Sequence, residues 1–517
     1  MSLKRHKTRL AFVKPARAAT PHQKAPRMHE PGSLAALQIK YGTRHRWLML
    51  VTVMIGSMAA IMSSTLMNVG IPDMSLQFAI GQERAQWVSS SFMVAMTVSM
   101  LTTPWLLARY GYRRTYTGCM LLLMSAGIGG GIANDYNWVL VARVAEGLAA
   151  GVVQPIPAII ILRAFDTSEQ GRANSFFGMG VVLAPAIGPS IGGVLVDWFG
   201  WRSLFFMVLP FCMASLWMSR RFVPTTAPGG VSANHGKPSL DMVGLTVAGV
   251  GTLCFLNSFV VMHNGAWLLS FGLMVASLLS LVGFVSWQRR RSSAGLHPLM
   301  DLQLFLNRPF AMGTVVAFTY GIALFGSTYL IPVYLQLGLG LSPSHVGGLL
   351  LPAGLVLAAT IAIVARYSST HPTHVLVSIG LVLLSLSFAL MLLVNLQTAL
   401  WVLVMLAILG RIGLGFILPS LNIGAMRSLD KTLIPQGASA INFLRMLGGA
   451  AGVSLCGVLL EWRIAVHGDL LSRPPSLARL AAFDEVFLGL GAICALALLA
   501  AWKIREAAVV SNTKPAP

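Results

Sequence analysis

The chain has 517 residues, of which 56% are hydrophobic and 10% charged, and 37 Lys and Arg against 16 Asp and Glu give a formal charge of +21. About a quarter of the residues of an ordinary soluble domain are charged, so this chain could not cover a water-facing surface, and its apolar content excludes a disordered protein. A basic chain can indicate nucleic-acid binding, but such binders carry their cations on a polar, soluble face. Long apolar runs recur here between Trp47 and Trp502, so the sequence predicts an all-α integral membrane protein with no nucleic-acid partner.

The first 46 residues are rich in Pro, Lys and Arg and contain no apolar core. We expect them to form a disordered basic tail. They are not expected to be a signal peptide, because no short apolar region with a small-residue cleavage site follows them.

Fourteen segments are long and apolar enough to cross a bilayer, for which about 20 residues are needed. Two are weaker than the rest, because the sixth is short before Arg220 and Arg221 and the seventh contains Asn257 and His263. The predicted spans are 47–71, 86–107, 115–132, 138–162, 173–196, 203–217, 242–262, 267–287, 309–335, 346–365, 375–393, 399–418, 440–460 and 486–502.

The basic residues gather on one side of this predicted topology. Of the 37 Lys and Arg, 29 fall in the two tails and in the connections that follow even-numbered spans, whereas five fall in the opposite connections. Cytoplasmic loops of membrane proteins carry the excess of Lys and Arg. We therefore expect an even number of spans in a cell (inner) membrane, with both termini in the cytoplasm.

No pattern in the sequence indicates an enzyme, a cofactor or a metal site. The five cysteines lie within predicted spans without metal-binding spacing, and the HExxH and phosphate-binding GxxxxGK[ST] motifs do not occur. Because the chain has no ATP-binding domain, active transport would have to use an ion gradient. The sequence therefore predicts a secondary carrier.

The fifth predicted span contains the segment APAIGPSIGG, residues 184–193. Small residues recur there every four positions and leave a flat stripe on which another helix can pack closely. Two prolines each remove a backbone hydrogen bond and bend the helix. We expect a bent, closely packed helix, although ordinary tight packing would need only the small residues. The residues concerned are Ala184, Pro185, Gly188, Pro189, Gly192 and Gly193.

This segment resembles the antiporter motif of the major facilitator superfamily, in the form found in its fourteen-span drug:proton antiporter branch. Other segments resemble the same branch in the same order along most of the chain. They are TLMNVGIP (65–72), LVARVAEGLAAG (140–151), WRSLFF (201–206), PLMDLQLFLNRPFAMG (298–313), LIPVYLQLGLGLS (330–342) and INFLRMLGGAAGV (441–453).

The resemblance implies two six-helix bundles, over residues 47–219 and 309–502, with two helices inserted in 220–308 and cytoplasmic tails at 1–46 and 503–517. It implies a small-molecule substrate bound near the middle of the bilayer and carried by alternating access. We therefore expect proton-coupled efflux of drugs or other small amphipathic compounds. Members of the branch that face an outer membrane can work with a periplasmic adaptor and an outer-membrane channel, so these are possible partners here.

Four positions depart from the family pattern, among them Pro104 in place of a family Gly and Glu146 in place of a family Gln. The connection after the second span resembles the superfamily's gating loop at Arg109, Gly111 and Arg113, but Ala108 stands where the family has Asp. An acid–arginine latch is therefore not expected, and the positive-inside bias explains these arginines equally well. In the first span Ser63 aligns with a family Asp that is associated with proton coupling, which disfavours the standard mechanism and a preference for cationic drugs.

Four residues of the Asp, Glu, Lys and Arg set lie well inside predicted spans: Arg143, Glu146, Arg411 and Arg445. A charge at the bilayer centre costs about 2.5–3.5 kcal/mol on insertion scales, so such residues face a partner or water. Arg143 and Glu146 are three residues apart on one helix face and can pair. We hypothesise that Glu146 couples proton movement to transport in place of Ser63. The alternative is that it only neutralises Arg143.

Arg411 occupies a place in the second half that mirrors the region of Arg143 in the first. Arg445 lies near the start of its predicted span, where its stem can extend toward the interface, and we interpret it as structural or gating. Side chains that could line the substrate cavity, or could simply be satisfied packing groups, are Ser63, Asn68, Gln154, Arg411, Asn422 and Arg445.

Two other functions stay open. The chain could be a carrier for one metabolite or siderophore, or a transporter-like sensor or scaffold that moves no substrate. The acids missing at positions 63 and 108 are what keep the second alternative open.

Overall fold

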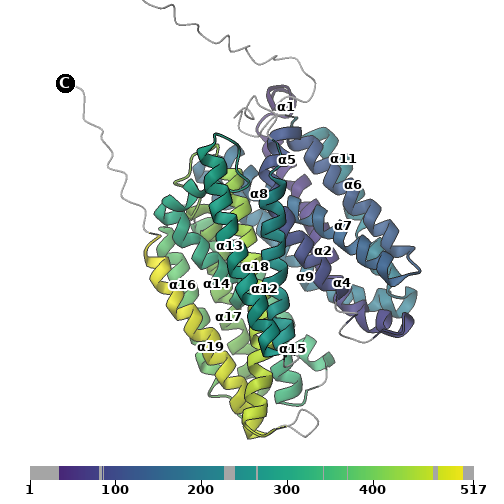
Figure 1. Ribbon diagram of the computed structural model, residues 1–517, viewed down its shortest axis with the longest axis vertical. Helices are drawn as coiled ribbons and strands as arrows, with labels where there is room; N and C mark the ends of the chain where they lie inside the picture. Colours follow the sequence, from purple (N-terminus) through teal and green to yellow (C-terminus); the bar gives the residue numbers. More distant parts are fainter. Residues whose placement is uncertain are drawn as a thin grey trace, which may run out of the picture.

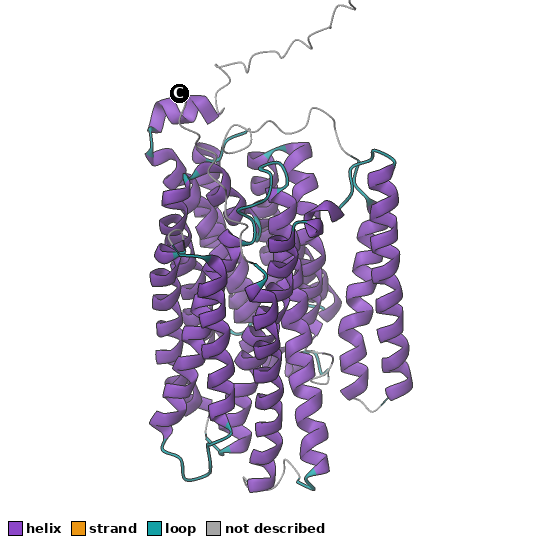
Figure 2. Cartoon of the chain, turned by 90° about the vertical axis from the view of Figure 1, so that its left-hand side faces the viewer, coloured by secondary structure: helices purple, strands orange, loops and turns teal. Residues whose placement is uncertain are grey.

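The computed structural model describes residues 34–80, 84, 87–225, 239–263, 266–341, 343–368, 371–469 and 476–504. All regular structure in these residues is helical, and the long helices run side by side (Figures 1 and 2). Twelve helices among them are long and apolar enough to cross a membrane. Two further long helices, α6 (Tyr112–Gly131) and α9 (Thr167–Phe199), pack against these. The predicted all-α membrane architecture is confirmed.

The N-terminal bundle lies on the right of Figure 1. Several of its spans consist of two helical pieces, and the second piece has a proline in or next to its first turn: Pro104, Pro155 and Pro210. Proline is tolerated there because the first amides of a helix have no intrahelical acceptor. Besides α6 and α9, this bundle contains α2 (Arg44–Gln77), α4 (Trp87–Ser99), α5 (Thr103–Tyr110), α7 (Tyr136–Val153), α8 (Ile156–Ala164), α10 (Arg202–Met207) and α11 (Leu209–Phe222).

The C-terminal bundle lies on the left of Figure 1. Its first helix begins where the Asn307 side chain accepts a hydrogen bond from the backbone N–H of Phe310 at 3.2 Å, which satisfies a free helix amide. The helices are α14 (Arg308–Val333), continued by a π-helical turn (Tyr334–Gly338), α15 (Pro343–Tyr367), α16 (Thr373–Met391), α17 (Leu400–Gly424), α18 (Ile434–Val466) and α19 (Leu477–Trp502).

Between the bundles in the sequence lies a helical hairpin of α12 (Met242–His263) and α13 (Trp267–Ser293), seen on the right of Figure 2. Helix α12 contacts α4 of one bundle and α18 of the other, whereas α13 packs on α12. Asp241, just before α12, connects this helix to α13. Its carboxylate accepts hydrogen bonds from Trp287 Nε1 at 2.9 Å and from Gln288 Nε2 at 2.8 Å. Large apolar side chains such as Leu268, 87% exposed, cover the outer face of α13, as expected for a surface in contact with lipid.

Part of the predicted disordered tail, residues 1–46, is helical. Helix α1 (Leu34–Tyr41) and the first turn of α2, which starts at Arg44, fall within it. The segment LAALQIKY consists largely of strong helix formers, and Leu37 is buried. Residues 1–33 lie outside the described residues.

Helices α14 and α18 approach each other through glycines. A Cβ added at Gly321 would lie 2.0 Å from the backbone oxygen of Arg445, and one at Gly448 would lie 2.1 Å from the backbone oxygen of Phe318. The two backbones therefore touch directly, which is possible only with small residues at the crossing.

We expect Gly321→Ala and Gly448→Ala each to destabilise the protein by about 1–3 kcal/mol, because the added methyl group forces the helices apart. The measurement is the melting temperature of the purified protein in detergent. Gly489→Ala in α19 is the matched control, since nothing lies within 4 Å of its added Cβ. A melting temperature of Gly321→Ala at or above that of the control contradicts the close crossing.

The two bundles are joined at one end of the molecule, at which α2 begins and α19 ends. We call it the terminal end, and it lies at the top of Figure 1; the opposite end is the distal end. Three donors of the N-terminal bundle form hydrogen bonds to backbone oxygens of the C-terminal bundle there. The pairs are Arg163 with Lys431, Asn174 with Pro419 and Ser175 with Ala362, at 2.5, 3.2 and 2.5 Å. The bundles are therefore held together at the terminal end.

Candidate functional site: two mid-membrane clusters of charged residues

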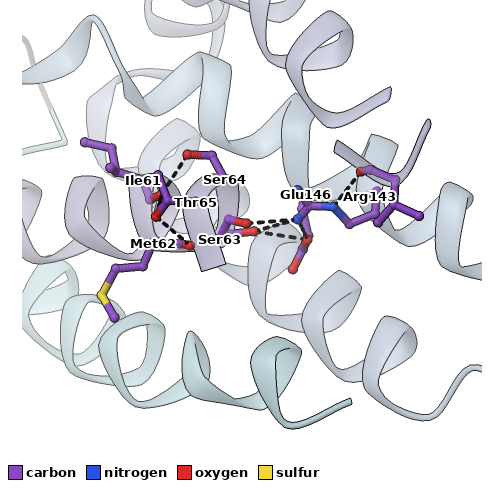
Figure 3. A network of polar contacts seen from close by, with 8 residues as sticks. Ile61, Met62, Ser63, Ser64, Thr65, Arg143 and Glu146 are labelled. Carbon is purple, nitrogen blue, oxygen red and sulfur yellow. Dashed lines mark hydrogen bonds and ion pairs between the residues drawn. The ribbon is translucent and has the colours of Figure 1, made fainter. Parts of the chain in front are cut away.

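Helix α7 presents Arg143 and Glu146 on one face, next to Ser63 of α2 (Figure 3). Arg143 Nη1 donates to Glu146 Oε2 at 2.6 Å and to Ser63 Oγ at 2.9 Å. Ser63 Oγ in turn donates to Glu146 Oε2 at 3.1 Å. The three side chains thus form a closed triangle between two helices, with Ser63 as one of its corners.

The triangle is sealed from water. The side chains of Arg143 and Glu146 are both 0% exposed. Helix α4 contributes two further contacts: Arg143 Nε donates to the backbone oxygen of Val88 at 3.0 Å, and its guanidinium carbon lies 4.3 Å from the centre of the Phe92 ring. The ion pair and the cation–π contact together offset the cost of burying the arginine charge.

The second carboxylate oxygen of Glu146 takes no part in the triangle. Its Oε1 is buried and has no hydrogen-bond partner among the described residues. It lies 3.6 Å from the position that a Cβ of Gly127 on α6 would take. A buried polar atom without a partner is costly. A proton added at Oε1 would leave Oε2 able to accept the hydrogen bonds of Arg143 and Ser63, but it would remove the negative charge that pairs with Arg143.

In the C-terminal bundle, Arg411 of α17 and Arg445 of α18 both lie close enough to Tyr320 of α14 to interact with it electrostatically. Arg411 Nη1 donates to Thr328 Oγ1 at 3.3 Å, and Arg445 Nη2 donates to Asn442 Oδ1 at 2.6 Å. Both arginines are partly exposed. This cluster contains two cations and neutral polar groups.

The observed start of α18 changes the interpretation of Arg445. The helix begins at Ile434, six residues before the predicted start of the span, so Arg445 lies about three turns inside it. The Asn442 contact also holds the guanidinium beside its own helix. Our interpretation of Arg445 as a residue near a helix end does not fit this position.

Helix α9 is continuous through the antiporter-like segment. Gly192 packs against α2, since an added Cβ would lie 2.9 Å from Leu66 Cδ2. The side chains of the other predicted residues of this stripe lie outside the described residues, so a fully small-residue contact surface stays a prediction. They are Ala184, Pro185, Gly188, Pro189 and Gly193.

The gating-like loop is held to the chain segment that follows α11. Gly111 has φ +77°, a region that favours glycine, and an added Cβ would lie 2.6 Å from the backbone oxygen of Thr225. Arg113 Nε donates to the backbone oxygen of Val223 at 2.6 Å. Arg109 lies over two neighbouring aromatic rings. The loop is thus held by the backbone of the segment that follows α11, at Val223 and Thr225.

The remaining cavity candidates do not join either cluster. Gln154 separates α7 from α8, Asn422 lies in α17, and both are partly exposed without a hydrogen bond to the clusters among the described residues. The side chain of Asn68 lies outside the described residues. Sequence reasoning did not identify Tyr320, Thr328 or Asn442. Neutral polar residues are common in spans, and only the three-residue spacing of Asn442 and Arg445 could have indicated a contact.

A bundle of membrane-length helices in two halves, each with charged side chains at mid-depth, defines the class of polytopic membrane transport proteins. This chain belongs to the Major Facilitator Superfamily, whose family model matches residues 53–453. It is therefore a transporter and not an enzyme, as predicted.

The chain is similar to the multidrug resistance protein Stp of Mycobacterium tuberculosis (strain CDC 1551 / Oshkosh), with 28% identity over 83% of this chain and 79% of the relative. It is similar to the multidrug export protein EmrB of Haemophilus influenzae, with 26% identity over 82% of both. The solved structure of the human organic anion transporter MFSD10 matches with a TM-score of 0.62 and 14% identity, covering 88% of this chain and 99% of that one, which shows the fold alone. The predicted resemblance to the multidrug efflux type is confirmed.

Proposed function

We propose that this chain is a fourteen-span exporter of the inner membrane that exchanges protons for drugs or other small amphipathic compounds. Its relatives include proteins named as multidrug export and multidrug resistance proteins, which supports the substrate class. The compound would bind between the two bundles and cross by alternating access.

The helix inventory and the charge distribution support this topology. The twelve candidate spans together with α6 and α9 make fourteen, and an even number returns both termini to one side. The excess of Lys and Arg on that side supports a cytoplasmic location. On this proposal the terminal end is the cytoplasmic end, and the hydrogen bonds of Arg163, Asn174 and Ser175 close it.

The observation that carries proton coupling is the carboxyl group of Glu146, buried at mid-depth with one oxygen paired and one unpaired. Buried carboxyl groups with a specific charge partner are typical of functional sites in membrane transport. The triangle with Ser63 connects α7 to α2, so the protonation state of Glu146 would change how these two helices are held.

Purified protein in liposomes tests the proposal. We expect accumulation of fluorescent dyes only under an imposed pH gradient, with loss of accumulation when nigericin collapses the gradient. Accumulation that is indifferent to the gradient contradicts proton coupling. Transport of a single metabolite or siderophore but of no dye would favour the narrow carrier, and transport of nothing would favour the sensor or scaffold.

A periplasmic adaptor and outer-membrane channel stay a prediction, for which co-purification from intact cells is the test.

A further inference from the structure

Among the described residues, the C-terminal bundle holds two positive charges inside its helices with no carboxylate paired to them. Arg411 is the twelfth of 25 residues of α17, and Arg445 is the twelfth of 33 residues of α18. Both donate to neutral oxygens, of Thr328 and Asn442. Neither forms an ion pair with any of the described residues.

The acidic residues of this bundle lie toward its ends. Asp430 lies in the connection between α17 and α18 at the terminal end. Glu461 lies on the same helix as Arg445 but sixteen residues further on, a rise of about 24 Å. The others also lie toward the distal end: Asp469, Asp484 and Glu485. Two of them already have basic partners, since Glu485 pairs with Arg463 and Asp469 with Arg479.

Glu146 does not serve as the missing counter-ion. It is fully buried within the N-terminal bundle, where Arg143 and Ser63 hold one of its oxygens. Its other oxygen lies beside Gly127 of α6, again within that bundle. The two bundles thus differ: one contains a neutralised arginine, and the other contains two arginines that no carboxylate neutralises.

A charge in the membrane interior requires a partner or contact with water. Arg411 and Arg445 are partly exposed and both interact electrostatically with Tyr320, so their guanidinium groups are accessible to a molecule from outside the bundle. Guanidinium groups bind carboxylates and sulfonates through short, charge-assisted and often bidentate hydrogen bonds. Lipid headgroups carry such charges at the membrane surface, whereas each of these arginines lies about three turns from the nearer end of its helix.

We infer that Arg411 and Arg445 bind the anionic group of the substrate, and that the compounds carried are amphipathic organic anions. This inference rests on the proposed transport function and narrows its substrate class.

Three dansyl compounds that share one fluorophore test the inference: dansylglycine (anionic), dansylamide (neutral) and dansylcadaverine (cationic). Binding to the purified protein in detergent is followed by dansyl fluorescence. We expect dansylglycine to bind about tenfold or more tightly than dansylamide, and dansylcadaverine to bind most weakly, because a charged group adds a strong hydrogen bond in this site. Arg411→Gln and Arg445→Gln should each lower dansylglycine affinity about tenfold and leave dansylamide affinity unchanged.

Arg411→Lys and Arg445→Lys, which keep the charge, are expected to retain part of the preference for the anion. Arg220→Gln, which removes an exposed positive charge at the end of α11, is the matched control and should change nothing. Three outcomes would overturn the inference. The first is equal or reversed affinities of the three compounds, and the second is no detectable binding of any of them. The third is a preference for the anion that survives both Gln substitutions. Binding of dansylglycine without proton-driven accumulation would instead contradict the proposed function and leave the anion site standing.

Discussion

Replacing Glu146 by Gln is expected to abolish proton-driven accumulation while substrate exchange continues. Gln keeps the side-chain length and an oxygen that can accept the hydrogen bonds of Arg143 Nη1 and Ser63 Oγ, but it cannot take up a proton. If the carboxyl group couples the proton to the substrate, transport under an imposed pH gradient should fall to the level of liposomes without protein. Counterflow, in which labelled substrate exchanges for unlabelled substrate without net proton movement, should persist and become independent of pH.

Glu146→Asp is the matched control for this experiment. It retains a carboxyl group and should keep part of the gradient-driven transport, although its shorter side chain lengthens the contact with Arg143. Counterflow measured on the same preparations shows that each variant is folded and binds substrate. Gradient-driven accumulation by Glu146→Gln at the wild-type rate would show that Glu146 only neutralises Arg143, and the proton site would have to be sought elsewhere.

The pairing of Arg143 with Glu146 was predictable from the sequence, whereas the part of Ser63 in the site was not. Arg143 and Glu146 are three residues apart in one helix, so local geometry alone places them on one face. Ser63 lies about 80 residues away along the chain, and its position between the two charges depends on how α2 packs against α7. The resemblance indicated that an acid was missing at position 63, but not that Ser63 would bind the acid on the neighbouring helix.

The helices were predicted better than their ends. Apolar length identified the spans because the bilayer imposes a minimum length on each of them. It did not identify the start of α18, because the residues before the predicted start, from Ile434 onward, continue the helix beyond the apolar run. That error of six residues moved Arg445 from the edge of a span to its interior and hid the cluster with Asn442. The prediction that residues 1–46 are disordered was wrong at α1 for a similar reason, since composition does not detect such a short helix.

Arg143→Gln is expected to destabilise the N-terminal bundle strongly. It leaves the Glu146 carboxylate buried and without its cation, and removal of one partner from a buried ion pair costs about 3–5 kcal/mol. It also removes the contacts with Val88 and Phe92. The measurement is the free energy of unfolding in detergent, compared with Arg46→Gln, whose partly exposed contacts with Asp166 and Glu169 should be worth about 0–1 kcal/mol.

The double variant Arg143→Gln, Glu146→Gln separates the structural role of the pair from its functional one. Because two amides leave no uncompensated charge, we expect the double variant to be more stable than Arg143→Gln alone, which is the pattern of a buried pair whose charges depend on each other. Stability recovered in this way should not restore gradient-driven transport, since the carboxyl group is still missing. An Arg143→Gln protein as stable as the Arg46→Gln control would contradict the buried ion pair. A double variant that regains gradient-driven transport would show that the pair stabilises the bundle and that protons cross by another route.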